Sequence, residues 1–336
     1  MNISFSVVVT NYNGKELLSK CINSILGQSY KKYEIIVADD GSTDDSVNYI
    51  KKKYKNKIKL SVLKINKGLS VNCNKAVKIC SKNYLIFLNN DSILEKNFLK
   101  KCCRIIKNSN CDVIIPKILS KNKNDKDLND IGYGIDVYGY PCAAWRSGSV
   151  FYSDGIIIIN KKKFIKIGKF DEDFFLYGED IDLFWRIQIS NLKISVDKKL
   201  TLNHFGSGSS FKVTKQINFF YKRRKLVERQ TLHTLLKYYN FFTLINILPK
   251  LFFFYILEFL YLIFFKFSLK SALIYPSSII WNFSKIKKIL IKRKKIKKIR
   301  IWKDKDITKK LYQKYRKLEI FLNYSAPKKI IFDKFK

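Results

Sequence analysis

The fold is decided by residues 7–46, which read VVVTNYNGKELLSKCINSILGQSYKKYEIIVADDGSTDDS. The apolar, β-branched run at 5–10 is typical of a strand that is buried on both faces. Residues 14–26 then place Leu, Cys and Ile side chains on one helical face, and 33–42 is a second apolar run that ends in acid and a turn. Strand, helix and strand in this order predict a right-handed βαβ unit within a parallel sheet.

The alternation of strands and helices continues beyond this unit. Helical patterns cover 44–54 and 68–80, strand patterns cover 58–65 and 84–91, and a further apolar strand is predicted over 154–164. Ligands of such sheets bind beyond the carboxyl ends of the strands. The polar residues expected at those ends are Thr10, Asp39, Asp40 and Asp91. Their coincidence predicts a ligand site at that edge of the sheet.

The composition describes a basic, folded chain. Its 336 residues are 47% hydrophobic, which suits one large domain or two smaller ones and excludes a disordered protein. The 66 Lys and Arg outnumber the 27 Asp and Glu and give a net charge of +39. An A+T-rich genome explains part of this lysine excess as well as selection for positive charge does. The seven cysteines lack metal-ligand spacing, which predicts reduced, buried thiols. The N-terminal residues run directly into a strand pattern, so we expect no signal peptide and a cytosolic catalytic side.

The scarce acid is concentrated in one segment, FDEDFFLYGEDIDLFWR (170–186). The aromatic residues interleaved with its carboxylates argue against a merely solvated acidic helix start. Asp182 and Arg186 are one helical turn apart and predict an internal ion pair. The apolar side chains expected to anchor this helix are Leu183, Phe184 and Trp185.

Four segments together resemble a family 2 glycosyltransferase with the GT-A fold. They are the opening stretch at 7–46, NKGLSVNCNKAVKICSKNYLIFLNND (66–91), FDEDFFLYGEDIDLFWRI (170–187) and HFGSGSS (204–210). They occur in the family's order, and the surface-polysaccharide branch that includes rhamnosyltransferases is the most similar. The resemblance implies an α/β fold with a Rossmann-like, mostly parallel sheet flanked by helices.

The resemblance also implies a nucleotide-diphosphate sugar donor, such as a UDP- or dTDP-sugar. Thr10 and Asp40 match the family positions that hold the base and ribose. The full set expected to bind the donor is Thr10, Asn13, Asp39, Asp40, Gly68, Asn74, Asn90 and Asp91. Two alternatives stay open at this point. Asp39 and Asp40 can cap the following helix, and Gly68 and Asn74 can serve ordinary turn and helix-surface roles.

A metal and a catalytic base are implied in the same way. LNND (88–91) occupies the place of the family's Asp-x-Asp, but its first acid is an asparagine, so only Asp91 is a strong ligand. His204 is expected to complete a Mn²⁺ or Mg²⁺ site, unless it is a hydrogen-bonded structural histidine. The family's base matches Asp180, with Glu179 beside it. We therefore expect a metal-dependent, inverting hexosyl or deoxyhexosyl transfer in which Asp180 takes the acceptor proton.

The last third of the chain has a different character. The apolar stretch 251–265 would form a helix of roughly 22 Å, which is shorter than the ~30 Å core of a bilayer. A second apolar piece follows at 271–283, and 284–302 mixes Lys and Arg with apolar residues at near-helical spacing, as membrane-surface helices do. A soluble helical pair is the alternative. The predicted regions are a GT-A catalytic domain at 1–210, an interfacial or re-entrant helical hairpin at 211–283 and a basic amphipathic tail at 284–336.

The leading hypothesis is an enzyme at the cytoplasmic face of the cell membrane, bound peripherally or re-entrantly. It would transfer sugar to a lipid-linked or growing surface glycan, and a second version has a protein or teichoic-type polymer as acceptor. A basic nucleic-acid-binding protein is a third hypothesis, but no nucleic-acid motif accompanies the charge and we expect no such partner. A catalytically inactive GT-A scaffold is a fourth, which Asn89 favours and the intact Asp91, Glu179 and Asp180 oppose.

Overall fold

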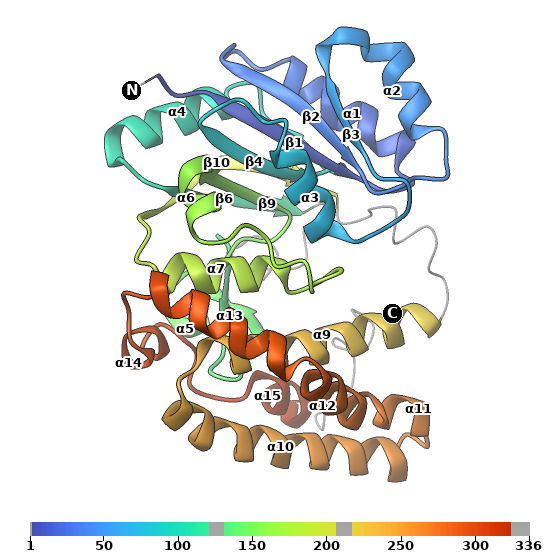
Figure 1. Ribbon diagram of the computed structural model, residues 1–336, viewed down its shortest axis with the longest axis vertical. Coiled ribbons are helices and arrows are strands. Elements are labelled where there is room, and N and C mark those ends of the chain that lie inside the picture. The colour runs from blue at the N-terminus through green and yellow to red at the C-terminus, as the bar shows by residue number, and fades with distance from the viewer. Residues whose placement is uncertain (1, 121–130, 206–216, 324–336) are drawn as a thin grey trace. The chain divides into compact units, whose positions relative to one another are not determined.

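The computed structural model describes residues 2–120, 131–205 and 217–323 (Figure 1). Parts of three predicted segments, the loop after 120, the stretch after 205 and the tail after 323, lie outside the described residues. The chain divides into two compact units. The first consists of 1–133, 152–187 and 191–213, and the second consists of 134–151, 188–190 and 214–336. The predicted domain bounds at 210 and 283 stay predictions.

The first unit is built on an eight-stranded sheet in the order β3-β2-β1-β4-β9-β6-β10-β5. Its strands are β1 (Phe5–Asn11), β2 (Tyr33–Asp39), β3 (Lys59–Val62), β4 (Tyr84–Asn89), β5 (Ser92–Leu94), β6 (Val113–Ser120), β9 (Ile156–Asn160) and β10 (Ile194–His204). β1, β2, β3 and β4 are mutually parallel where they pair, as are β6 and β10, whereas β9 and β5 run antiparallel to their neighbours. This confirms the predicted α/β fold with a mostly parallel sheet.

Helices flank this sheet and follow the predicted apolar faces. They are α1 (Lys15–Leu26), α2 (Ser46–Tyr54), α3 (Leu69–Val77), α4 (Phe98–Ser109), α6 (Lys161–Lys166) and α7 (Glu179–Ile189), with a 3₁₀ turn at Lys55–Lys57. In α1, Leu18, Cys21, Ile22 and Ile25 are buried at the i, i+3, i+4, i+7 spacing of one helical face. All seven cysteines are free and buried, as predicted.

The segment predicted as one strand over 154–164 is two elements. β9 ends at Asn160, whose side-chain oxygen accepts a hydrogen bond from the backbone N–H of Lys163 at 3.2 Å. This N-cap begins α6, because it satisfies one of the amide groups that the first helical turn leaves unpaired.

The second unit is mainly helical in its described part. Its elements are β7 (Tyr133–Ile135), which pairs with β8 (Pro141–Ala143), and the helices α5 (Ala144–Ser147), α9 (Ile217–Tyr238), α10 (Phe241–Phe264), α11 (Leu269–Ala272), α12 (Ile274–Ser284), α13 (Ile286–Ile299), α14 (Asp304–Thr308) and α15 (Arg316–Asn323). α9 contacts both α12 and α13, and α10 contacts α11.

α10 is longer than the apolar helix predicted at 251–265. It begins at Phe241 and continues through Pro249, whereas a proline usually marks a helix boundary. Its 24 residues extend for about 36 Å, so the expectation that it is too short to cross a bilayer was wrong on length. In the described ranges it is the one helix long and apolar enough to span a membrane, and 17% of its most apolar window is buried.

Candidate active site

The site begins where β1 and β2 end side by side. The amide nitrogen of Asn11 donates to Oδ2 of Asp39 at 2.8 Å, and the Ser42 hydroxyl donates to the same oxygen at 2.7 Å. The backbone N–H of Ser42 donates to Oδ1 of Asp39 at 2.9 Å, so this buried carboxylate holds the turn after β2. The N-cap of α2 is Asp45. The alternative that Asp39 caps that helix was therefore wrong.

Asp40 holds the turn that precedes α3. Its two carboxylate oxygens accept the backbone N–H groups of Lys67 and Gly68, each at 2.9 Å, and it does not cap α2. Burial raises the pKa of Asp40; the two N–H donors offset part of this effect, and the neighbouring Asp39 charge adds to it. Gly68 has φ +89°, and a Cβ there would lie 2.4 Å from the carbonyl oxygen of Phe175. Only glycine fits at this position. Because it has no Cβ, the acid-rich segment can lie close to the start of α3.

Asn74 and Asn13 anchor loops around the site. The Asn74 side chain donates to the carbonyl of Phe170 at 2.9 Å and to Oε1 of Glu172 at 3.0 Å, and accepts from the Phe170 N–H at 3.1 Å. It thereby holds the start of the acid-rich segment. The Asn13 side-chain oxygen accepts from the N–H of Thr43 at 2.7 Å. Both amides are occupied by the protein, and their contact with a donor stays a prediction.

The LNND motif crosses the middle of this edge. The Thr10 hydroxyl lies 3.4 Å from Oδ1 of Asn89, and the Asn90 amide donates to Oδ1 of Asn11 at 2.8 Å. Asn90 is buried, so it is committed to the β1 side of the site. The two asparagines therefore shape the edge between β1 and β4, and Asp91 is the acid that the motif offers.

Asp91 and His204 face each other at the next position. β10 pairs with β5 so that His204 lies opposite Ser92, which places the imidazole beside Asp91. Nε2 of His204 is 3.1 Å from Oδ1 of Asp91, and neither buried atom has another hydrogen-bond partner among residues 2–120, 131–205 and 217–323. Burial lowers the pKa of His204, but Asp91 outweighs this and raises it, and the charge of Asp154 raises it further. This pair can hold either a proton or a cation.

A metal ion at this pair would need ligands from outside the protein. In the described part of the chain, no three His, Cys, Asp or Glu side chains are placed to hold one ion together. Asp91 and His204 offer one hard oxygen and one imidazole nitrogen, a donor set that suits Mn²⁺ or Mg²⁺ when phosphate oxygens and water complete the shell. The two orphaned atoms fit such an ion.

Glu179 and Asp180 open α7. Oε2 of Glu179 is buried and has no hydrogen-bond partner within the described residues, and Oδ1 of Asp180 accepts the N–H of Ile181 at 2.7 Å. Burial raises the pKa of Glu179 to about 7, and the charges of Asp154 and Asp182 contribute to the increase. Burial also raises the pKa of Asp180 well above its usual range, with the charges of Asp154 and Glu179 adding to the effect. A cation nearby would lower both values.

The sequence pattern did not reveal Asp154 as a site residue. It is exposed and directly precedes Gly155, whose carbonyl accepts the N–H of Asn89 at 3.3 Å. A Cβ on Gly155 would lie 3.2 Å from Nε2 of His204, so this turn lies against the Asp91–His204 pair. In an antiparallel β9, the residues before the strand lie at the carboxyl edge of β4. The sequence predicted a strand here but did not give its direction.

Five side chains therefore form one group, which we call the carboxylate site: Asp91, Asp154, Glu179, Asp180 and His204. The charge of Asp154 acts on both Asp180 and His204, and His204 contacts Asp91. The two acids at 91 and 180, predicted to converge, are thus linked through Asp154. Their chemical roles stay predictions.

The predicted ion pair anchors α7 to its neighbours. Nη2 of Arg186 is 2.8 Å from Oδ2 of Asp182, and both side chains are buried. Nη1 of Arg186 also donates to the carbonyl of Ile167 at 2.9 Å and to that of Lys169. The apolar residues between them are each at most 1% exposed: Leu183, Phe184 and Trp185. The helix that presents Glu179 and Asp180 is therefore rigidly anchored.

Residues 6–168 match the family model described as Glycosyl transferase family 2. These residues are therefore a glycosyltransferase family 2 domain within the chain. The predicted family and GT-A fold are thereby confirmed. The match includes the Thr10, Asp40 and Asp91 strand ends and the Asp154 turn, and it ends before α7 and His204.

Two curated relatives of the chain are named for transfer to poly(ribitol-phosphate). It is 29% identical over 232 residues to the poly(ribitol-phosphate) β-N-acetylglucosaminyltransferase TarP of Staphylococcus aureus, which covers 62% of this chain and 66% of TarP. It is 31% identical over 125 residues to a poly(ribitol-phosphate) β-glucosyltransferase of Bacillus spizizenii, which covers 36% of this chain. The match spans 20% of that second relative, so the chain corresponds to part of it.

Solved structures show the same fold. S. aureus TarS aligns with a TM-score of 0.51 at 21% identity, over 70% of this chain and 43% of TarS. GalNAc-T7, solved with UDP, GalNAc and Mn²⁺, aligns with a TM-score of 0.57 at 15% identity, over 71% of this chain and 48% of that one. At these identities the likeness establishes the fold alone.

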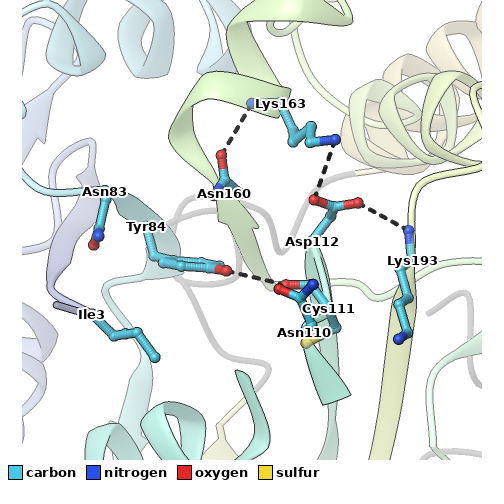
Figure 2. Close-up of a pocket in the computed structure, with 9 residues that line it drawn as sticks. All are labelled: Ile3, Asn83, Tyr84, Asn110, Cys111, Asp112, Asn160, Lys163 and Lys193. Carbon is cyan, nitrogen blue, oxygen red and sulfur yellow. Dashed lines mark hydrogen bonds and ion pairs between the residues drawn. The ribbon is translucent and has the colours of Figure 1, made fainter. Parts of the chain in front are cut away.

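The first unit also has a pocket at the opposite end of its strands (Figure 2). This hollow of about 400 Å³ is lined by Tyr84, Asp112, Lys163 and Lys193, among others. Asp112 is engaged there, because Lys163 Nζ lies 3.6 Å away and the N–H of Lys193 donates to it at 3.1 Å. Tyr84 begins β4 and Asn89 ends it, so the pocket is about 16 Å from the carboxylate site. It is not the predicted donor site.

Proposed function

We propose that the chain is a metal-dependent, inverting glycosyltransferase that moves a hexosyl or deoxyhexosyl group from a nucleotide-diphosphate sugar. One observation carries the proposal: the charge of Asp154 acts both on His204, which contacts Asp91, and on Asp180 of α7. Parallel α/β sheets bind ligands at this edge. The family match and the names of the relatives support the same activity.

The donor would lie along the ends of β1 and β2. The TarS structures solved with UDP and with UDP-GlcNAc, and the N-acetylglucosaminyl and glucosyl transfers in the relatives' names, make UDP-linked hexoses the first donors to test. A dTDP-sugar is the second choice. Asp39 and Asp40 already accept protein donors, but a carboxylate has about four lone-pair sites, which leaves acceptor capacity for a uracil or thymine N3–H.

The metal would be held by Asp91 and His204 and by the donor diphosphate. Bound there, Mn²⁺ or Mg²⁺ supplies Lewis-acid stabilisation of the departing diphosphate. The same positive charge would lower the pKa of Asp180 and Glu179, which faces no described cation in the resting protein. The base would then ionise when the charged donor is in place.

Asp180 is the proposed base. The acceptor hydroxyl oxygen forms the new bond to the anomeric carbon, and the bond from that carbon to the diphosphate breaks with its electron pair on the diphosphate. The hydroxyl proton passes to the Asp180 carboxylate. The β-linked products in the relatives' names agree with inversion of an α-linked donor.

The acceptor we favour is an alditol-phosphate polymer of the teichoic type. The poly(ribitol-phosphate) in the relatives' names supports it over the lipid-linked saccharide of the leading sequence hypothesis. We place the protein at the cytoplasmic face of the membrane. α10, with its exposed apolar residues, supports that location.

A donor screen tests this function. The full chain is incubated with UDP- and dTDP-sugars, with Mn²⁺ or with EDTA, and release of nucleoside diphosphate is measured with and without poly(ribitol-phosphate). We expect turnover of one donor, dependent on metal and stimulated by polymer. Donor binding without turnover would favour an inactive scaffold, and salt-sensitive DNA binding without donor affinity would favour the nucleic-acid hypothesis.

A further inference from the structure

We infer that the second unit is a monotopic membrane-binding module, with α10 lying in the surface of an anionic bilayer instead of crossing it. The proposed function places the protein at the membrane, and this inference adds how α10 lies there. Only the biological reason for the membrane contact rests on the proposed function. The inference concerns which face of α10 meets lipid, and it holds or fails independently of sugar transfer.

α10 has two faces of opposite environment. One face is turned into the second unit by Leu251, Tyr255 and Leu262, which are buried at a spacing of four and seven residues, with Glu258 between them. The other face carries large apolar side chains that are each at least 42% exposed: Phe253, Ile256, Leu257, Leu260 and Phe264. An amphipathic surface helix normally exposes polar residues on its outer face. Here the outer face is apolar, so it needs a partner.

The inner face is fixed by charge. Oε2 of Glu258 is 2.9 Å from both Nη2 of Arg224 and Nζ of Lys317, and the Tyr315 hydroxyl donates to Oε1 at 2.9 Å. Lys317 also lies 2.7 Å from Oε1 of Glu228. Crossing a bilayer would carry Glu258 into hydrocarbon and separate it from these partners, which is strongly unfavourable. The network therefore keeps α10 attached along its length to the second unit.

The exposed apolar surface continues after α10. It extends through the turn into α11 and along α12, where the residues at least 46% exposed are Phe265, Phe267, Leu269, Leu273, Ile280 and Phe283. α11 contacts both α10 and α12 (Figure 1). Soluble monomers rarely expose contiguous apolar surface of this kind, so the surface marks an interaction site.

Charge identifies the partner as an anionic lipid surface. α13 contains no acid, and it packs on α9 with Ile289 and Ile296 buried. Its exposed lysines are Lys287, Lys288, Lys294, Lys295, Lys297 and Lys298. A second copy of this chain would bring the same positive charges together, which opposes self-association. An exposed apolar surface and a basic helix in one unit are the combination that binds anionic bilayers.

Vesicle flotation tests the contact with the full chain. We expect flotation with phosphatidylcholine vesicles that contain phosphatidylglycerol, and about tenfold weaker binding without it. The triple variant Phe253→Ser, Leu260→Ser, Phe264→Ser should lose flotation, whereas Ile165→Ser, a similarly exposed residue of the first unit, should not. Lys294→Glu with Lys297→Glu should lose the preference for the anionic lipid. Equal flotation of the triple variant and wild type would overturn the inference.

Thiol labelling separates a surface helix from a span. Because all seven native cysteines are buried, Asn240→Cys and Lys266→Cys each add one thiol at an exposed polar position at the two ends of α10. A membrane-impermeant maleimide added outside sealed vesicles should label both ends. Protection of one end only would show a span and refute the in-plane position. A lipid-free dimer that the triple variant abolishes would assign the face to self-association.

The donor assay is run in parallel on the same variants. Flotation without donor turnover would leave this inference standing and remove the proposed function, and turnover without flotation would do the reverse.

Discussion

Both ends of the central sheet carry carboxylates, but their surroundings differ. At one end the carboxylate has a lysine beside it, and at the other end the carboxylates have other acids beside them. At the pocket end, Asp112 lies between Lys163 and the backbone of Lys193 (Figure 2). At the carboxyl end, burial raises the pKa of Glu179 and of Asp180, and the charge of Asp154 adds to the increase in both. A protein that is rich in lysine has left these acids without a described cation. This contrast supports the proposal that a cation accompanies the ligand of the carboxylate site.

The largest effect is expected at Asp180. Asp180→Asn removes the proposed base while keeping the size of the side chain, so transfer should fall by about 10³-fold. Donor affinity, measured by calorimetry with Mn²⁺, should change little. Near-normal turnover of this variant would refute the assignment, and the matched variant Asp112→Asn at the other end of the sheet serves as control.

The next effect is expected at the Asp91–His204 pair. Asp91→Asn and His204→Ala should each lower turnover by at least about 100-fold and weaken Mn²⁺ binding, because each removes a proposed metal ligand. Titration with Mn²⁺ monitored by tryptophan fluorescence or calorimetry checks the second point without turnover. If His204→Ala binds Mn²⁺ as the wild type does, the histidine is structural.

Asp154→Asn should have a smaller effect, of about tenfold on turnover. Its charge raises the pKa of both acids of α7, so its loss should move the rising limb of the pH–rate profile to lower pH. A merely structural residue would change the rate and leave the profile in place. The profile of kcat against pH, measured with saturating metal, distinguishes the two.

Glu179 provides a prediction on stability. Its pKa of about 7 in the folded protein lies above the ordinary unfolded value, so the unfolded state ionises first as the pH rises. Burial of Glu179 therefore destabilises the fold increasingly between about pH 4 and pH 7. Glu179→Gln should raise the free energy of unfolding by about 2 kcal/mol at pH 8 and by little at pH 4. Urea unfolding at the two pH values measures this, and an equal gain at both would contradict the pKa shift.

The smallest effect is expected at Asp112, in the pocket. Its contact with the partly exposed Lys163 is long, so Asp112→Asn should change stability by less than about 1 kcal/mol and leave turnover intact. Thermal unfolding and the donor assay check this. A loss of turnover comparable to that of Asp154→Asn would erase the proposed difference between the two ends.

Strand ends and helix faces could be predicted because they depend on local patterns. The runs that form β1, β2 and β4 are apolar throughout, and their carboxyl ends carry Asp39 and Asp91 as expected. Asp154 could not be predicted, because a buried apolar run does not reveal the direction of its strand. Only the pairing of β9 antiparallel to β4 brings that acid to the site.

The hydrogen-bond partners of the polar side chains could not be predicted from the sequence either. Asn74 matches a donor position by resemblance, yet its amide holds Phe170 and Glu172, residues about 100 positions away. α10 begins at Phe241, ten residues before the predicted apolar stretch. Contacts between distant segments hold the side chain of Asn74, and no local pattern encodes them.

Lys317 limits how far the second unit can be shortened by deletion. Its ammonium group neutralises two glutamates, Glu228 on α9 and Glu258 on α10, and it comes from α15 near the end of the described chain. A shortened protein that ends before it would leave the buried Glu228 without this cation and the partly buried Glu258 with Arg224. Deletions in this region would therefore disturb folding together with any lipid contact. Single substitutions on the outer face of α10 separate the two effects.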